Sequence, residues 1–209
     1  MSFADEIRAT FRRGDSAAVL RLAEAEVTRA RAAGEPAGEV EALYALARLA
    51  LRGEDLPRAE HLAQAALDVA LRAGDRELEE RPRHVLAAVA RLSGDYALAR
   101  DRYEASIALN RALGRDETVQ TELYNLAFVE LHLGNVSRAR ELFARTDTIG
   151  NRFQKMAEAA VAAAEGDLAR AADALAATEA AFADAGQVPD PDDAAELARI
   201  RATVSGEVS

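Results

Sequence analysis

The chain has 209 residues and a formal net charge of −10, and half of its residues are apolar although only 5% are aromatic. It contains no cysteine, which excludes disulfides, thiolate metal ligands and thiol nucleophiles. The negative charge argues against nucleic acids and anionic membranes as partners, since phosphate binding needs clustered lysine and arginine. The charged N-terminal residues do not fit a signal peptide and no long apolar run follows, so we expect a cytoplasmic protein.

Alanine, leucine, arginine and glutamate dominate the sequence, and all four favour helices. Only five prolines occur, and no run of β-branched residues indicates a strand. With few aromatic side chains, the core must consist mainly of small residues, which let helices approach closely in many thin packing layers. The composition therefore predicts an all-α fold.

Apolar residues recur at helical spacing along the chain, and each such run ends at a glycine, the usual residue at a left-handed helix end. Two series of glycines with spacings near 40 residues result: Gly14, Gly53, Gly94, Gly134 and Gly166, and Gly34, Gly74, Gly114, Gly150 and Gly186. The residue after each member of the first series is acidic or Asn: Asp15, Glu54, Asp95, Asn135 and Asp167. We expect the Asp and Asn residues to cap the next helix, and acidic residues suit its positive end.

These boundaries predict five helix pairs, over residues 2–33, 37–73, 76–113, 116–149 and 151–185. A last helix over 191–204 carries one apolar stripe, with Asp192, Asp193, Glu196, Arg199 and Arg201 outside it, and we expect those charged residues to face water. Such a helix suits the end of a repeat array because it covers the last repeat and presents a polar side. We treat residues 1–209 as a single domain.

One motif recurs every 40 residues through the middle of the chain. It consists of Leu-Ala in the first helix, Gly-Asp or Gly-Asn at the turn and a small Ala in the second helix. In the third pair it is Leu86-Ala87, Gly94-Asp95 and Ala99; it recurs as Leu46-Ala47 and Ala59, and as Leu126-Ala127, Gly134-Asn135 and Ala139. It resembles the tetratricopeptide repeat (TPR) in a longer form of roughly 40 residues, similar to the repeats of MalT- and LuxR-like regulators and of kinesin light chains.

The resemblance implies an α-solenoid, a right-handed superhelix of five TPR-like hairpins and a capping helix. In such proteins the first helices line a concave groove that commonly binds peptides or partner proteins. The large Trp and Tyr of the shorter TPR pattern are missing from the first helices here. No DNA-binding or ATPase segment accompanies the repeats, so the activities of those regulators are not carried over.

The Leu-Ala register predicts which side chains face this groove. The residue two positions before Leu forms one column, and neighbouring positions on the same side extend it; Asn125 stands where peptide-binding TPRs often carry a clamp asparagine. The predicted groove residues are Tyr44, Arg48, Arg81, His84, Tyr124, Asn125 and Phe128, while Arg52, Arg91 and His132 lie toward the turns. The alternative is that Tyr44, His84 and Tyr124 pack between adjacent helices and that the arginines are solvated surface residues.

The predicted function is protein or peptide binding, as an adaptor or regulatory scaffold. Because the inner strip is relatively basic and aromatic, we expect a ligand with an acidic group beside an apolar side chain. The sequence has no GxGxxG, GxxxxGK or HExxH motif, so we predict no catalytic residues, no cofactor and no metal. Three rivals remain open: a small-molecule site or atypical enzyme around His84, self-association of the chain, and a regulatory subunit that acts with a separately encoded partner.

Overall fold

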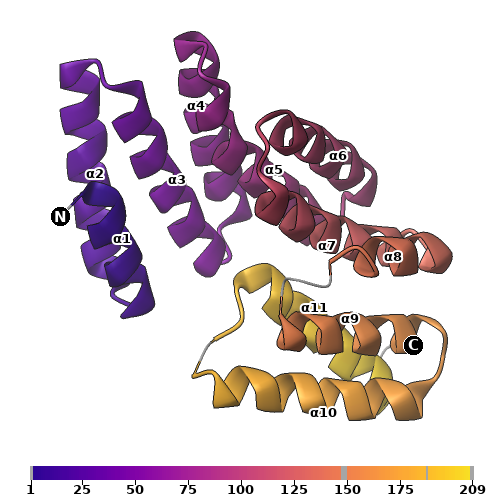
Figure 1. Ribbon diagram of the computed structural model, residues 1–209. Coiled ribbons are helices and arrows are strands. Elements are labelled where there is room, and N and C mark those ends of the chain that lie inside the picture. Colours follow the sequence, from indigo (N-terminus) through magenta and orange to yellow (C-terminus); the bar gives the residue numbers. More distant parts are fainter. Residues whose placement is uncertain (1, 147–149, 187, 208–209) are drawn as a thin grey trace. The chain divides into compact units, whose positions relative to one another are not determined.

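The computed structural model describes residues 2–146, 150–186 and 188–207, and over these ranges it contains helices and turns but no strand (Figure 1). The helices are α1 (Phe3–Arg12), α2 (Ser16–Ala33), α3 (Pro36–Arg52), α4 (Leu56–Ala73), α5 (Glu80–Leu92), α6 (Tyr96–Ala112), α7 (Asp116–His132), α8 (Val136–Phe143), α9 (Asn151–Ala164), α10 (Leu168–Asp184) and α11 (Pro191–Ser205), and a 3-10 turn, η1 (Arg76–Glu79), leads into α5. The predicted all-α fold of five hairpins and a final helix is confirmed.

Consecutive helices pack as hairpins, for example α1 with α2, α3 with α4, α7 with α8 and α9 with α10, and α2–α3 and α6–α7 contacts join neighbouring hairpins. The fourth pair differs from its prediction because α8 ends at Phe143. There Thr146 supplies both its backbone N–H and its hydroxyl to the Phe143 carbonyl, at 3.0 and 2.8 Å, which satisfies an acceptor at the helix end. Residues 147–149 of the predicted pair lie outside the described residues.

The chain divides into two compact units, Met1–Val89 (unit 1) and Ala90–Ser209 (unit 2), with the boundary inside α5. Each unit has an apolar core of its own. Larger buried members are Ile7, Phe11, Val19, Val40 and Leu43 in unit 1, and Tyr124, Phe128, Met156, Leu175 and Phe182 in unit 2. Many fully buried alanines stand between them, so the predicted core of small residues is confirmed.

The turns between the two helices of a hairpin follow the predicted capping in three of four cases. Asp15, Asp95 and Asp167 each accept a hydrogen bond from a backbone N–H three residues on, at 2.9 to 3.2 Å. The prediction for Asn135 is wrong: its side-chain amide donates instead to Glu130 Oε2 at 2.7 Å.

In the second hairpin the predicted left-handed helix end, Gly53, is wrong by one residue. The cap of α4 is Asp55, which accepts from the Arg58 N–H at 3.1 Å. The left-handed residue of this turn is Glu54, with a φ of 58°, whereas Gly53 has a φ of −90°. Position 54 stands 40 residues from both neighbouring left-handed glycines, so the repeat keeps its spacing but has a strained residue where the others have glycine.

We expect Glu54→Gly to raise the free energy of unfolding by about 0.5–1 kcal/mol, because relief of the left-handed strain exceeds the extra chain entropy that glycine loses on folding. Urea unfolding measures the change. The matched control is Gly94→Glu, which puts glutamate at a φ of 80° in the next hairpin and should lower stability. Equal free energies of unfolding for the Glu54→Gly variant and the unaltered chain would contradict the prediction and show that the left-handed conformation of Glu54 costs no stability.

Candidate functional site

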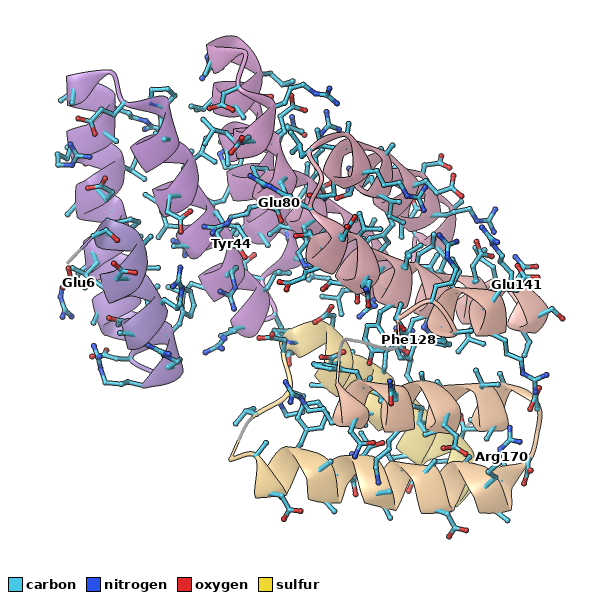
Figure 2. All side chains as sticks on the ribbon, viewed as in Figure 1. Glu6, Tyr44, Glu80, Phe128, Glu141 and Arg170 are labelled. Carbon is cyan, nitrogen blue, oxygen red and sulfur yellow. The ribbon has the colours of Figure 1, made fainter. Side chains whose placement is uncertain are left out.

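Four of the predicted groove residues, Tyr44, Arg48, Arg81 and His84, lie in unit 1 and are half-buried. Tyr44 and Arg48 are one turn apart on α3, and Figure 2 shows the position of Tyr44 on that helix. Their predicted place in a binding groove stays a prediction.

Cations and rings alternate in this part of unit 1. The Arg48 guanidinium carbon lies 4.8 Å from the Phe11 ring centroid and 5.7 Å from the Tyr44 ring centroid, and the Arg81 guanidinium lies 5.3 Å from the Tyr44 ring. Burial raises the pKa of the Tyr44 hydroxyl, and the charges of Arg48 and Arg81 oppose that rise. We call Phe11, Tyr44, Arg48 and Arg81 the cation–aromatic strip.

One carboxylate adjoins the strip. Arg81 NH1 donates to Glu41 Oε2, which joins α3 to α5 across 40 residues of sequence, and both side chains keep part of their surface exposed, 39% for Arg81 and 22% for Glu41. A guanidinium stacked on a ring presents its N–H groups at its edge, where a carboxylate can bind in two-point fashion. One carboxylate, that of Glu41, already pairs with the Arg81 guanidinium of the strip.

The other three predicted groove residues are interior residues of unit 2. Tyr124, Asn125 and Phe128 are only 4%, 3% and 1% exposed. Tyr124 packs edge-on against Phe128, Phe143 and Phe153, with ring centroids 5.0, 5.7 and 5.5 Å away. Tyr124 therefore packs between helices, as in the alternative interpretation. Its contact with a ligand stays a prediction, and such a contact requires the helices that cover Tyr124 to move.

Helix α11 covers this interior, as its contacts with α9 and α10 and with residues of α5 and α7 show (Figure 1). Arg91 of α5 is 1% exposed. Its NH1 group donates to Asn125 Oδ1 at 3.0 Å, and its NH2 group lies 3.0 Å from Asp192 Oδ2 of α11. Its Nε lies 3.9 Å from Glu196 Oε1, one turn further along α11.

A second group of contacts attaches the next turn of α11. Tyr96 and His132 stack with ring centroids 4.4 Å apart. Arg199 NH1 donates to the Tyr96 hydroxyl at 2.7 Å and lies 2.8 Å from His132 Nε2, which is itself 2.9 Å from Glu196 Oε1. Residues from α6, α7 and α11 thus meet in one polar cluster that continues the Arg91 contacts.

The expectation that the charged residues of α11 face water is therefore wrong for its first two turns. Asp193 and Glu196 are only 8% and 5% exposed. Burial first, and the neighbouring Asp192 charge second, raise the pKa of the Asp193 carboxyl to about 8, although the Arg91 charge opposes the rise. The sequence did contain a signal, since Asp192, Glu196 and Arg199 share one face of a helix, but nothing in it showed that a second surface covers that face.

The part of unit 2 beside the short helix α8 contains a hollow of about 340 Å³. Its lining comes from the segment around α8 and from α9 and α10: Arg140, Phe143, Thr146, Gln154, Ala157, Glu158, Val161 and Arg170. Arg140 and Arg170 both form ion pairs with Glu165, so a carboxylate of the chain itself already partners these two cations. None of the predicted groove residues lines this hollow, so the small-molecule interpretation around His84 gains no support from it.

The described ranges contain neither a candidate metal site nor a candidate membrane-spanning helix. No group of three or more His, Asp or Glu side chains among them has an arrangement that could hold a metal ion. In the same ranges, every helix is too short or too polar to span a lipid bilayer.

Solved structures with similar folds were found, although no protein-family model and no curated protein matches the sequence. BtubC (BKLC) from P. vanneervenii superposes with a TM-score of 0.62 at 21% identity, covering 93% of this chain and 84% of that one. A Podosopora anserina kinesin light chain-like protein with nearly identical TPR-like repeats gives 0.62 at 17% identity, covering 88% and 94%. A Rap protein complexed with Competence and Sporulation Factor gives 0.70 at 14% identity, covering 99% of this chain and 60% of that one. The predicted resemblance is confirmed at the level of the fold: this chain has the fold of TPR-like repeat proteins.

Proposed function

We propose that the protein is a binding scaffold that holds a segment of another protein, or a peptide, through the cation–aromatic strip and His84 of unit 1. The observation that carries the proposal is the half-buried Tyr44 ring with the guanidinium groups of Arg48 and Arg81 beside it. The TPR-like neighbour complexed with Competence and Sporulation Factor supports a binding role for this fold.

The strip suits a segment with an acidic group beside an apolar side chain. A carboxylate is attracted by the two arginines, and an apolar group gains contact area on the exposed part of the rings. Glu41 is the natural competitor, because it already pairs with Arg81. We propose no cofactor, nucleic acid or membrane for this site, since the net charge of −10 opposes phosphate-rich partners, and we propose that binding takes place in the cytoplasm.

Affinity capture from the native cell extract, followed by mass spectrometry and a binding measurement with the recovered partner, tests the site. Tyr44→Ala and Arg81→Gln should each weaken the partner's affinity by about tenfold or more. Arg138→Gln is the matched control, because Arg138 forms an exposed pair with Glu141 on α8 and should leave the affinity unchanged.

The Glu41→Gln variant separates recognition from structure. If Arg81 binds the partner's acidic group, removal of its internal competitor should leave affinity unchanged or raise it. If Arg81 matters only because it joins α3 to α5, Glu41→Gln should weaken binding as much as Arg81→Gln does. That second result, or unchanged affinity in both strip variants, would overturn the proposed site.

A further inference from the structure

We infer that α11 occupies a binding surface of unit 2 as an internal ligand, and that a partner's acidic amphipathic helix binds there by replacing it. We call this surface the α11 seat, formed by Arg91, Tyr96, Tyr103, Tyr124, Asn125, Phe128 and His132. The inference rests on the proposed role as a binding scaffold but on residues separate from the cation–aromatic strip.

The contacts between α11 and the seat have the chemistry of ligand recognition more than that of a repeat cap. Acidic side chains at positions 192 and 196 meet the buried Arg91, and Leu197 and Ile200 join the apolar cluster around Tyr124 and Phe128. Carboxylates next to apolar side chains on one helix are therefore what this surface accepts, and the chain displays one example of such a helix.

Polar groups of the seat are incompletely satisfied by α11. Among the described residues, the buried Nε and NH2 atoms of Arg91 and the hydroxyls of Tyr103 and Tyr124 have no hydrogen-bond partner, although Asp192 Oδ2 is 3.0 Å from Arg91 NH2. The Asp192 carboxylate thus neutralises the guanidinium without directing an oxygen along its N–H bonds. A buried donor without an acceptor lowers stability, so a ligand whose carboxylate accepts from these donors can compete with α11.

Helix α11 is also attached in a way that allows exchange. Residues 188–190 before it form no regular structure, and the Val188 side chain is 90% exposed. Asp193 must be buried near Asp190, Asp192 and Glu196 when α11 docks, which opposes docking as long as Asp193 is ionised. Docking of α11 therefore either keeps Asp193 protonated or buries an unfavourable charge, and a ligand helix without a carboxylate at this position avoids that cost.

A synthetic peptide of residues 188–207, labelled with fluorescein at its N-terminus, tests the inference on the full chain. Asp192→Asn/Glu196→Gln in the protein removes the carboxylates that hold α11 and should raise peptide affinity by about tenfold or more relative to the unaltered chain. Asp173→Asn/Glu158→Gln makes the same charge change at exposed positions outside the seat and should leave affinity unchanged. A peptide with both Asp192 and Glu196 neutralised should bind more weakly than the parent peptide.

Displacement of α11 is measured separately by electron–electron distances. Because the chain has no cysteine, Glu104→Cys on α6 and Ala198→Cys on α11, both at exposed positions, accept nitroxide labels without background. Saturating parent peptide should add a population at longer distance to a distribution that is single and narrow without peptide. Circular dichroism of each variant confirms that it is folded.

Three results would overturn the inference. The first is an unchanged distance distribution at saturation, which would show that the peptide binds elsewhere; the second is no gain in affinity in the Asp192→Asn/Glu196→Gln protein. The third is a dimer in light scattering on loss of the carboxylates, which would show that the seat takes α11 of a second copy. Any of these leaves the strip proposal standing if Tyr44→Ala and Arg81→Gln still weaken partner capture.

Discussion

Replacement of Arg91 by methionine is expected to lower the free energy of unfolding of the protein by about 3–5 kcal/mol, because it leaves buried carboxylates without their cation. Arg91 is 1% exposed and is the charge partner of Asp192 and, at longer range, Glu196, and it also donates to Asn125. Urea unfolding followed by circular dichroism measures the loss. The labelled pair at positions 104 and 198 should at the same time report a broad distance distribution, because α11 leaves its seat.

Two further variants keep this prediction specific to the charge. Arg138→Met on α8 removes an exposed arginine, half of whose side-chain surface is in solvent, and should change stability by less than about 1 kcal/mol. Arg91→Met combined with Asp192→Asn and Glu196→Gln should recover more than half of the loss, since Arg91 and its two carboxylate partners are then all replaced by uncharged side chains. A loss without recovery would show that Arg91 acts through its packing on Phe128 and not through its charge.

The second large effect is a fall in stability as pH rises from about 5 to 8, caused by Asp193. Its pKa is raised from 3.8 to about 8 in the folded chain, so across this window the folded state keeps a proton that the unfolded state has released. Stability must then decrease with rising pH and level off above the folded-state value. The charged and titratable groups that act on or with Asp193 are Arg91, Tyr103, Tyr124, Asp190, Asp192 and Glu196.

The variant Asp193→Asn isolates this contribution, because asparagine resembles the protonated carboxyl and does not titrate. Its advantage in unfolding free energy over the unaltered chain should grow by at least about 2 kcal/mol between pH 5 and pH 9. Carboxylates whose pKa is lowered, such as Asp5 and Glu26, are ionised throughout this range and do not disturb the comparison. Parallel pH profiles for the two proteins would show that Asp193 is ionised in the folded chain at neutral pH.

Both predictions concern the charge contacts that hold α11 on its seat. Loss of the Arg91 charge and ionisation of Asp193 are each expected to weaken those contacts. A carboxylate in competition for Arg91, or a rise in pH, acts on the same contacts. The distance between labels at positions 104 and 198 therefore measures the effect of a competing ligand and the effect of pH alike. If both lengthen this distance, the contacts that stabilise α11 on the seat are the same contacts that a ligand must replace.

The sequence by itself determined the hairpins, most of their boundaries and three of the four caps predicted at the turns within hairpins. These features depend on interactions between residues a few positions apart, such as the hydrogen bond that the Leu98 N–H donates to Asp95 Oδ1. The 40-residue spacing also contained the position of the strained turn found among the described residues. Glu54, and not Gly53, stands 40 residues from its counterparts, but a glycine next to it was the more obvious choice from residue type.

Only the tertiary structure decided which polar face is buried. The repeat register predicted one groove for Tyr44, Arg48, Tyr124, Asn125 and Phe128. Tyr44 and Arg48 are half-buried in unit 1, whereas Tyr124 and Phe128 pack in an apolar cluster with residues of α9 and α11. Arg91 and Asp192 meet across 101 positions of sequence. Helical periodicity reports which side chains share a face, but whether that face meets water or another helix depends on distant contacts, and these set the charge and the pKa of the groups that lie there.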